Sequence, residues 1–150
     1  MDRIRVLFVC THNSARSVMA ETFLNSLGSG RFHAESAGLE PRETNPLVVR
    51  AMKEEGYDLS GRQGNSIFEY FKEGRLYDYV VYVCASEDED RCPVFPGVRR
   101  SLHWPFPDPS KLQGTEEEKL SQIRRIRDQI RSKVETWIHE ITCVFKGGLQ

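Results

Sequence analysis

Residues 6–17 read Val-Leu-Phe-Val-Cys-Thr-His-Asn-Ser-Ala-Arg-Ser, an apolar run that passes directly into a polar loop. The run begins at Ile4 and is almost continuously apolar, which is typical of a strand covered on both faces of a parallel sheet. Apolar residues then recur at spacings of three and four over 17–27. This spacing predicts an amphipathic helix that ends at Gly28.

The rest of the chain repeats this alternation of strand and helix. Thr115 and Glu118 are spaced as a capping box at the start of a long apolar stripe, which predicts a final helix from Thr115 onward. The other predicted elements are strands at 32–37, 79–83 and 98–104 and helices at 44–55 and 66–72. The alternation predicts one α/β domain over 1–150, an open and mainly parallel four-stranded sheet flanked by helices.

Composition excludes several classes of function. The 150 residues carry 21 Lys+Arg against 22 Asp+Glu, so no excess of positive charge favours nucleic acid or an anionic membrane as a partner. No apolar run approaches the length of a membrane span, and the N-terminus does not read as a signal peptide. We therefore expect a cytoplasmic protein, and nothing in the pattern indicates an obligate oligomer, so we expect a monomer.

The four cysteines do not have the spacing of a zinc site, since no C-x2-C pair exists and the histidines are scattered. In a cytoplasmic protein they are expected to be reactive or buried. They are Cys10, Cys84, Cys92 and Cys143. Cys143 lies beside the apolar stripe of the last helix and is expected to be a packing residue.

The loop after the first strand has the composition of an oxyanion site. A loop that turns into a helix N-terminus presents several backbone N–H groups to one point, and the same field favours a thiolate at Cys10. Arg16 offers a planar fork for two oxyanion oxygens, and the Ser17 hydroxyl can donate to the Cys10 sulfur. Binding of arsenate, phosphate or sulfate is expected from the loop residues Thr11, His12, Asn13, Ser14, Ala15, Arg16 and Ser17, with His12 shaping the rim rather than acting as a base.

Asp108 is the expected proton donor for the leaving oxygen. It follows the last predicted strand on a proline-rich loop, so it should lie at the same edge of the sheet as Cys10. The flanking Trp104 and Phe106 are expected to desolvate the carboxyl and raise its pKa.

The stretch from Val6 to Glu21, together with Asp108-Pro109, resembles the low-molecular-weight protein tyrosine phosphatase fold, and the resemblance covers nearly the whole chain. Two chemistries occur on that scaffold, phosphotyrosine hydrolysis and arsenate reduction. The phosphatases typically carry a second cysteine where this chain has Ala15, and they usually carry a proline where it has Val18. Both differences favour the reductase.

Cys84 ends a buried strand and Cys92 follows in a short, acidic segment that is a candidate for local unfolding. This arrangement resembles the thioredoxin-coupled arsenate reductases. The resemblance implies that Cys10 is the nucleophile, that Arg16 binds arsenate, and that Asp108 is the acid. It also implies that Cys84 is the resolving thiol, that Cys84 and Cys92 form the redox-active disulfide, and that thioredoxin, rather than a tightly bound cofactor, supplies electrons.

The sequence also departs from those reductases. Seven residues separate Cys84 from Cys92, one more than is usual, and residues 87–90 are all acidic, which disfavours a nearby thiolate. Some of these reductases hold a potassium ion behind the loop. The matching positions here are Asn13, Glu21, Ser36 and Asn65, of which Asn65 lacks the carboxylate that some relatives use.

Two other functions remain open at this point. One is a tyrosine phosphatase that works through a Cys10 phosphoenzyme, and weak phosphatase activity is expected of the reductase as well. The other is a non-enzymatic module that binds oxyanions or switches with the redox state of its thiols. The reductant also remains open between thioredoxin, glutaredoxin and a low-molecular-weight thiol.

Overall fold

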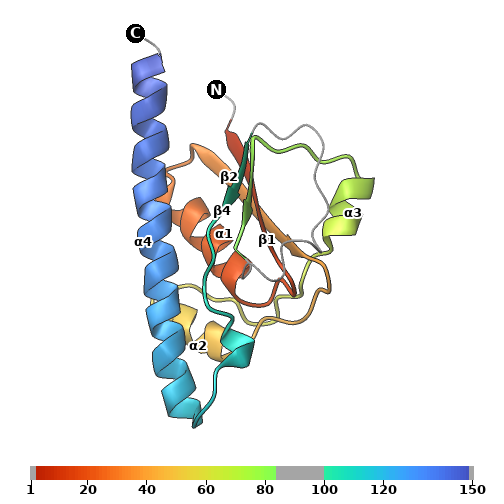
Figure 1. Cartoon of the computed structure of the whole chain (residues 1–150), viewed down its shortest axis with the longest axis vertical. Coiled ribbons are helices and arrows are strands. Elements are labelled where there is room, and N and C mark those ends of the chain that lie inside the picture. The colour runs from red at the N-terminus through yellow and green to blue at the C-terminus, as the bar shows by residue number, and fades with distance from the viewer. Residues whose placement is uncertain (1–2, 84–99, 149–150) are drawn as a thin grey trace.

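The computed structural model describes residues 3–83 and 100–148 and contains a four-stranded sheet in which every strand pair is parallel (Figure 1). The strand order is β2-β1-β3-β4. The strands are β1 (Ile4–Cys10), β2 (Phe32–Gly38), β3 (Tyr79–Tyr82) and β4 (Arg100–His103). The predicted open, parallel four-stranded sheet is therefore confirmed, and the carboxyl ends of all four strands meet at one edge.

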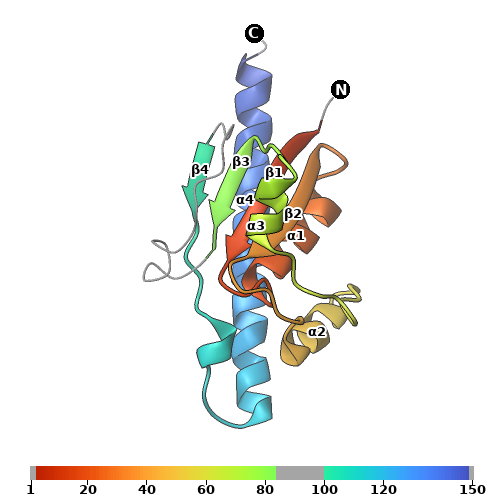
Figure 2. The same cartoon turned by 90° about the vertical axis from the view of Figure 1, so that its right-hand side faces the viewer.

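Helices cover both faces of the sheet. Helix α1 packs against α4, and α2 also contacts α4, while α3 lies on the opposite side (Figures 1 and 2). In Figure 2, α3 stands in front of the sheet and α4 behind it. Their bounds are α1 (Arg16–Leu27), α2 (Pro46–Lys53), α3 (Ile67–Lys72) and α4 (Glu116–Gly148), and a 3₁₀ turn, η2 (Pro109–Lys111), precedes α4.

The central strand β1 is buried on both faces, as its continuous apolar run predicts. Val6 and Phe8 face the larger core beneath α1, α2 and α4, whereas Leu7 and Val9 face a smaller core beneath α3. Both cores therefore hold β1 in place. The residue that ends β1 and the loop that follows it start from a rigid base.

Local hydrogen bonds set the helix ends. The predicted capping box is confirmed, since Glu118 N donates to Thr115 Oγ1 over 3.1 Å and Thr115 N donates to Glu118 Oε1 over 3.4 Å. The helix expected over 44–55 is shorter, because Asn45 caps it by accepting from Leu47 N and Pro46 occupies its first turn.

Candidate active site

The loop between β1 and α1 has its backbone carbonyls turned outward. Glu40 N donates to Thr11 O over 2.8 Å, Arg42 N to His12 O over 3.0 Å, and Asn45 N to Ser14 O over 2.8 Å. In a trans peptide the N–H of the next residue points away from the carbonyl. The amides of His12, Asn13 and Ala15 are therefore directed to the inner side of the loop, as the expected oxyanion nest requires.

The end of β2 packs directly beneath this loop. Gly38 pairs with Cys10 in the sheet, and a Cβ at Gly38 would stand 2.7 Å from Asn13 N and 2.9 Å from the His12 carbonyl carbon. Only glycine permits this approach. Asn13 itself has φ of 49°, a left-handed conformation that asparagine tolerates well, and its Oδ1 accepts from Asn65 N over 2.8 Å.

The Cys10 sulfur ends β1 inside the loop and is 2 % exposed. Asn13 N donates to Sγ over 3.2 Å, and the Ser17 hydroxyl lies 2.9 Å from Sγ. The Asn13 side-chain Nδ2 donates to Ser17 Oγ over 2.8 Å. Since that hydroxyl oxygen already accepts, its own hydrogen is free to donate to the sulfur, which favours the thiolate.

Arg16 and Asp108 are brought together although they are far apart in the sequence. The Arg16 side chain is 3 % exposed, its Nη1 donates to Phe106 O over 3.2 Å, and its Nη2 lies 3.8 Å from Asp108 Oδ2. Within the described ranges this is the one hydrogen bond of the guanidinium, so donors remain for a bidentate oxyanion. Asp108 therefore lies beside Arg16, the residue that ends the loop after Cys10.

The expectation that the pKa of Asp108 is raised is wrong. Burial does act to raise the pKa of Asp108, but hydrogen bonds from Ser110 N and Ser110 Oγ and the charges of Arg16 and Lys111 outweigh it, and the net pKa is lowered. Asp108 caps the η2 turn through these Ser110 bonds. Trp104 and Phe106 are buried beside it as expected, yet they do not decide its ionisation.

The model of the family described as low molecular weight phosphotyrosine protein phosphatase matches residues 5–144. The chain belongs to this phosphatase family. Within it, the arsenate reductase of Halalkalibacterium halodurans is 37 % identical over 137 residues, which is 91 % of this chain and 96 % of that protein. The arsenate reductase homology that the sequence predicts is confirmed.

Two solved arsenate reductases superpose on this member of the phosphatase family. One, in its phosphate-binding state, has a TM-score of 0.75 at 30 % identity and covers 92 % of this chain and 98 % of its own. Another, in its oxidised state, has a TM-score of 0.73 at 31 % identity and covers 91 % of this chain and 98 % of its own. The structural similarity therefore agrees with the sequence similarity in relating the chain to arsenate reductases.

The residues expected to hold potassium lie together, but they do not fit a bound ion in this family member. Arg62 Nη2 lies 3.0 Å and 2.8 Å from the two carboxylate oxygens of Glu21 and donates to Ser36 Oγ over 3.1 Å. Asn13 Oδ1 is already used by Asn65 N. The carboxylate that would attract a cation therefore faces a guanidinium of the chain itself. No cluster of three metal-ligating side chains occurs among the residues that the structure describes.

Cys84 and Cys92 lie outside the described residues, and Cys143 lies in α4, where only the backbone is described. The described chain does reach Val83, whose amide donates to Val9 O over 2.9 Å. The chain therefore leaves β3 beside the strand that ends at Cys10.

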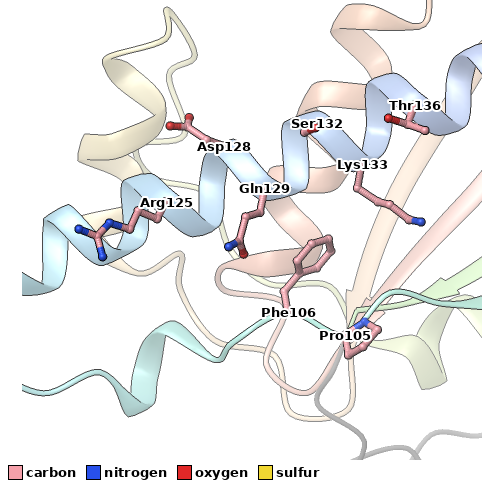
Figure 3. Close-up of a pocket in the computed structure, with 8 residues that line it drawn as sticks. All are labelled: Pro105, Phe106, Arg125, Asp128, Gln129, Ser132, Lys133 and Thr136. Atoms are coloured by element: carbon pink, nitrogen blue, oxygen red, sulfur yellow. The ribbon is translucent and has the colours of Figure 1, made fainter.

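A separate open hollow lies between the Asp108 loop and α4 (Figure 3). Pro105 and Phe106 form one side, and α4 forms the other with Arg125, Asp128, Gln129, Ser132, Lys133 and Thr136. Phe106 belongs to both regions, since it lines this hollow and its carbonyl accepts from Arg16 Nη1 of the active-site loop. The hollow contains none of the groups assigned to catalysis.

Sequence reasoning missed Gly38, the Phe106 carbonyl and Arg62. A glycine at the end of a predicted strand was a weak signal for close backbone approach, whereas a carbonyl contact and the partner of Arg62 have no signature in sequence.

In the described parts of the chain, no helix is both long and apolar enough to cross a membrane.

Proposed function

We propose that the protein is an arsenate reductase that uses Cys10 as its nucleophile. The observation that carries the proposal is the environment of the buried Cys10 sulfur. It accepts a hydrogen bond from Asn13 N and faces the Ser17 hydroxyl, inside a loop whose amides point inward. Such a loop binds a tetrahedral oxyanion and keeps a thiolate next to it. The 37 % identical arsenate reductase relative and the reductase solved in its phosphate-binding state support this substrate class.

Arsenate binds in the loop with its oxygens on the amides of His12 and Ala15 and on the free donors of Arg16, while the Asn13 amide donates to the Cys10 sulfur. The thiolate then attacks arsenic, an As–S bond forms, and the opposite As–O bond breaks. The departing hydroxyl leaves as water after it accepts a proton from Asp108. No separate base is proposed, because the Asn13 amide and the Ser17 hydroxyl face the sulfur and stabilise negative charge on it.

Oxyanion binding would change the electrostatic surroundings of the Asp108 carboxyl. The pKa of Asp108 is lowered by hydrogen bonds from Ser110, and the charge of Arg16 is a further cause. A bound dianion engages Arg16 and adds negative charge near the carboxyl, and both effects raise the pKa of Asp108. The acid is therefore switched on by oxyanion binding.

Reduction follows by thiol–disulfide exchange. The Cys84 thiolate attacks the Cys10 sulfur, the S–S bond forms, and the As–S electron pair returns to arsenic, which leaves as arsenite. The Cys92 thiolate then attacks Cys84, and Cys10 is released as a thiolate. A dithiol, which we propose to be thioredoxin, reduces the Cys84–Cys92 disulfide and completes the cycle with two electrons.

Two observations support the relay. Val83, the residue before Cys84 in the sequence, donates its amide to Val9 O, and Val9 precedes Cys10 in β1. An arsenate reductase of similar structure has also been solved in an oxidised state. We further propose that the chain acts as a single-domain monomer in the cytoplasm, with no tightly bound cofactor.

Tyrosine phosphatase activity is the second candidate, because the matching family model is that of the phosphotyrosine phosphatases and the first step needs the same groups. Water, rather than Cys84, would then release a Cys10 phosphoenzyme. A thiol switch without enzymatic activity would need only Cys84 and Cys92. Cys10→Ser would abolish both enzymatic activities and leave such a switch intact.

The test is arsenate-dependent oxidation of NADPH with thioredoxin and thioredoxin reductase, with aryl phosphate hydrolysis measured on the same samples. We expect arsenate turnover that Cys84→Ser and Cys92→Ser abolish while aryl phosphate hydrolysis persists. Glutaredoxin or a low-molecular-weight thiol in place of thioredoxin identifies the donor. Brisk phosphatase activity without arsenate turnover would favour the phosphatase instead.

A further inference from the structure

A charged cluster is connected to the active-site loop through Asn65. Glu21 comes from α1, Ser36 from β2, and Arg62 from the segment before α3. Arg62 Nη2 lies 2.8 Å from Glu21 Oε2 and donates to Ser36 Oγ over 3.1 Å, and the Ser36 hydroxyl donates to Glu21 Oε1 over 3.1 Å. One nitrogen of Arg62 thus contacts the oxygens of both neighbours.

The carboxylate of this cluster needs a positive partner. The Glu21 side chain is 13 % exposed and Ser36 is fully buried. Burial raises the pKa of Glu21, and the nearby Glu35 adds to the effect, whereas Arg62 and the Ser36 hydroxyl oppose it. An unpaired buried carboxylate is costly, and Arg62 supplies the positive charge that stabilises the ionised form of Glu21.

The position of Arg62 is set by this contact rather than by general surface pairing. Its side chain is 26 % exposed, and its Nε is buried without a hydrogen-bond partner in the described structure. The Arg62 backbone carbonyl accepts from Thr44 N over 3.3 Å. This bond joins Arg62 to residues 40–45, whose amides bond to the carbonyls of the active-site loop. The guanidinium therefore reaches inward to Glu21 at some cost to its own hydrogen bonding.

The cluster is connected to the Cys10 sulfur through three hydrogen bonds. Ser36 O accepts from Asn65 Nδ2 over 3.1 Å, Asn65 N donates to Asn13 Oδ1 over 2.8 Å, and Asn13 N donates to Cys10 Sγ over 3.2 Å. Asn13 is the loop residue with the left-handed backbone. A displacement of Ser36 would thus reach the residue that shapes the loop.

We propose that Arg62 is a built-in cation that neutralises Glu21 in place of a bound monovalent ion and thereby positions the oxyanion loop without potassium. Arg62 is a positioning residue, because it acts through Ser36, Asn65 and Asn13 and does not reach the oxyanion. The proposal goes beyond the redox function, since it concerns how the loop is held whether or not arsenate is reduced.

The experiment compares the wild type with Arg62→Ala in potassium chloride and in choline chloride at equal ionic strength. Thermal unfolding and the affinity for inorganic phosphate are measured, neither of which requires turnover. The wild type should give equal values in both salts. In choline, Arg62→Ala should melt about 5 °C lower and bind phosphate about tenfold more weakly. Potassium should reverse both losses with a saturable dependence, because the ion then occupies the position of the guanidinium.

Two further variants keep the test specific. Arg62→Lys retains the charge and should behave as the wild type in either salt, and Arg50→Ala removes an exposed arginine that pairs with Glu116 at the surface and should change neither quantity. The double variant Glu21→Gln, Arg62→Ala has no charge to neutralise. It should regain stability in choline and ignore potassium, even if Arg62→Ala alone fails to fold.

Several results would overturn the proposal. A wild type that binds phosphate more tightly in potassium than in choline would show that the ion site is still in use. An Arg62→Ala protein that equals the wild type in choline, or whose losses potassium does not relieve, would show that Arg62 does not substitute for an ion. A double variant as impaired as Arg62→Ala would show that Glu21 is not the charge concerned.

Discussion

The sulfur of Cys10 is held by groups that are themselves fixed. Asn13 N donates to it, and Ser17 Oγ is oriented toward it by Asn13 Nδ2. The loop carbonyls bond outward to the backbone of residues 40–45, so the inward amides need no rearrangement when an oxyanion arrives. The nucleophile and the binding site for its substrate are therefore built from the same few residues.

Asp108→Asn should remove the proton donor and leave oxyanion binding intact. Because Asn Oδ1 can still accept from Ser110, the η2 turn should persist. General acid catalysis typically contributes about 10²–10⁴-fold, so kcat for arsenate should fall within that range while the affinity for phosphate changes little. Steady-state kinetics and phosphate titration measure the two quantities.

Asp58→Asn is the matched control for this variant. Asp58 accepts from Ser60 N and Ser60 Oγ in the same kind of Asp–Ser turn, but it is exposed and does not contact the loop or Arg16 in the described structure. It should leave kcat unchanged. If the two variants lose activity equally, Asp108 has no special role as an acid.

At the scale of the elements, the loop is shaped by strand β2 and the segment after it as much as by its own sequence. The closest contact is between Gly38 and the backbone of His12 and Asn13. A methyl group there would stand within 3 Å of backbone atoms from both residues and of Thr11 O. The loop must move if that space is filled.

Gly38→Ala should therefore weaken oxyanion binding more than it weakens the fold. We expect the affinity for phosphate to fall by about tenfold or more, with a loss of about 1–3 kcal/mol in the free energy of unfolding. Gly30→Ala is the comparison, since Gly30 has no neighbour within 4 Å, although its φ of 76° makes alanine strained there. It should lower stability and leave phosphate affinity unchanged. Equal phosphate affinity in both variants would contradict the role given to Gly38.

Much of this element-level picture could be predicted from sequence, because it depends on local pattern. Apolar continuity predicted that β1 is buried, and the Thr115–Glu118 spacing predicted the start of α4. The ionisation of Asp108 was predicted wrongly, since it depends on Ser110 and Arg16 as well as on burial. Arg62 contacts Glu21, which lies 41 residues earlier in the sequence, and Gly38 packs against the backbone of Asn13. Such contacts exist only once the chain is folded.

At the scale of the whole molecule, α4 is fastened to the rest of the fold by a charged cluster as well as by its apolar stripe. Arg124 Nη2 lies 2.7 Å from Glu54 Oε2, Arg127 Nη1 lies 2.9 Å from Glu54 Oε1, and Arg127 Nη1 also donates to Ala51 O over 2.8 Å. Glu54 caps the end of α2. Its carboxylate thus joins α2 to α4.

Glu54→Gln should lower stability in a pH-dependent way. Hydrogen bonds from Arg124 lower the pKa of Glu54 to about 2, so its contribution is present above the unfolded value of about 4.3 and is lost as the pH falls toward 2. Because the side chain is 38 % exposed, solvent screening limits the loss to about 1 kcal/mol at pH 7. Urea unfolding at pH 7 and pH 3 should show the difference from wild type narrowing at the lower pH. A constant difference, or one no larger than that of the exposed Glu140→Gln, would contradict this role.

The most direct test of the central claim is a single turnover without any external reductant. Fully reduced protein, freed of reductant, is mixed with arsenate, and arsenite, free thiols and disulfide-linked peptides are quantified. The account predicts about one arsenite per chain, the loss of two thiols, and a disulfide between Cys84 and Cys92, all abolished in Cys10→Ser. Arsenite formation without loss of these thiols, or no arsenite from fully reduced protein, would contradict the three-cysteine relay.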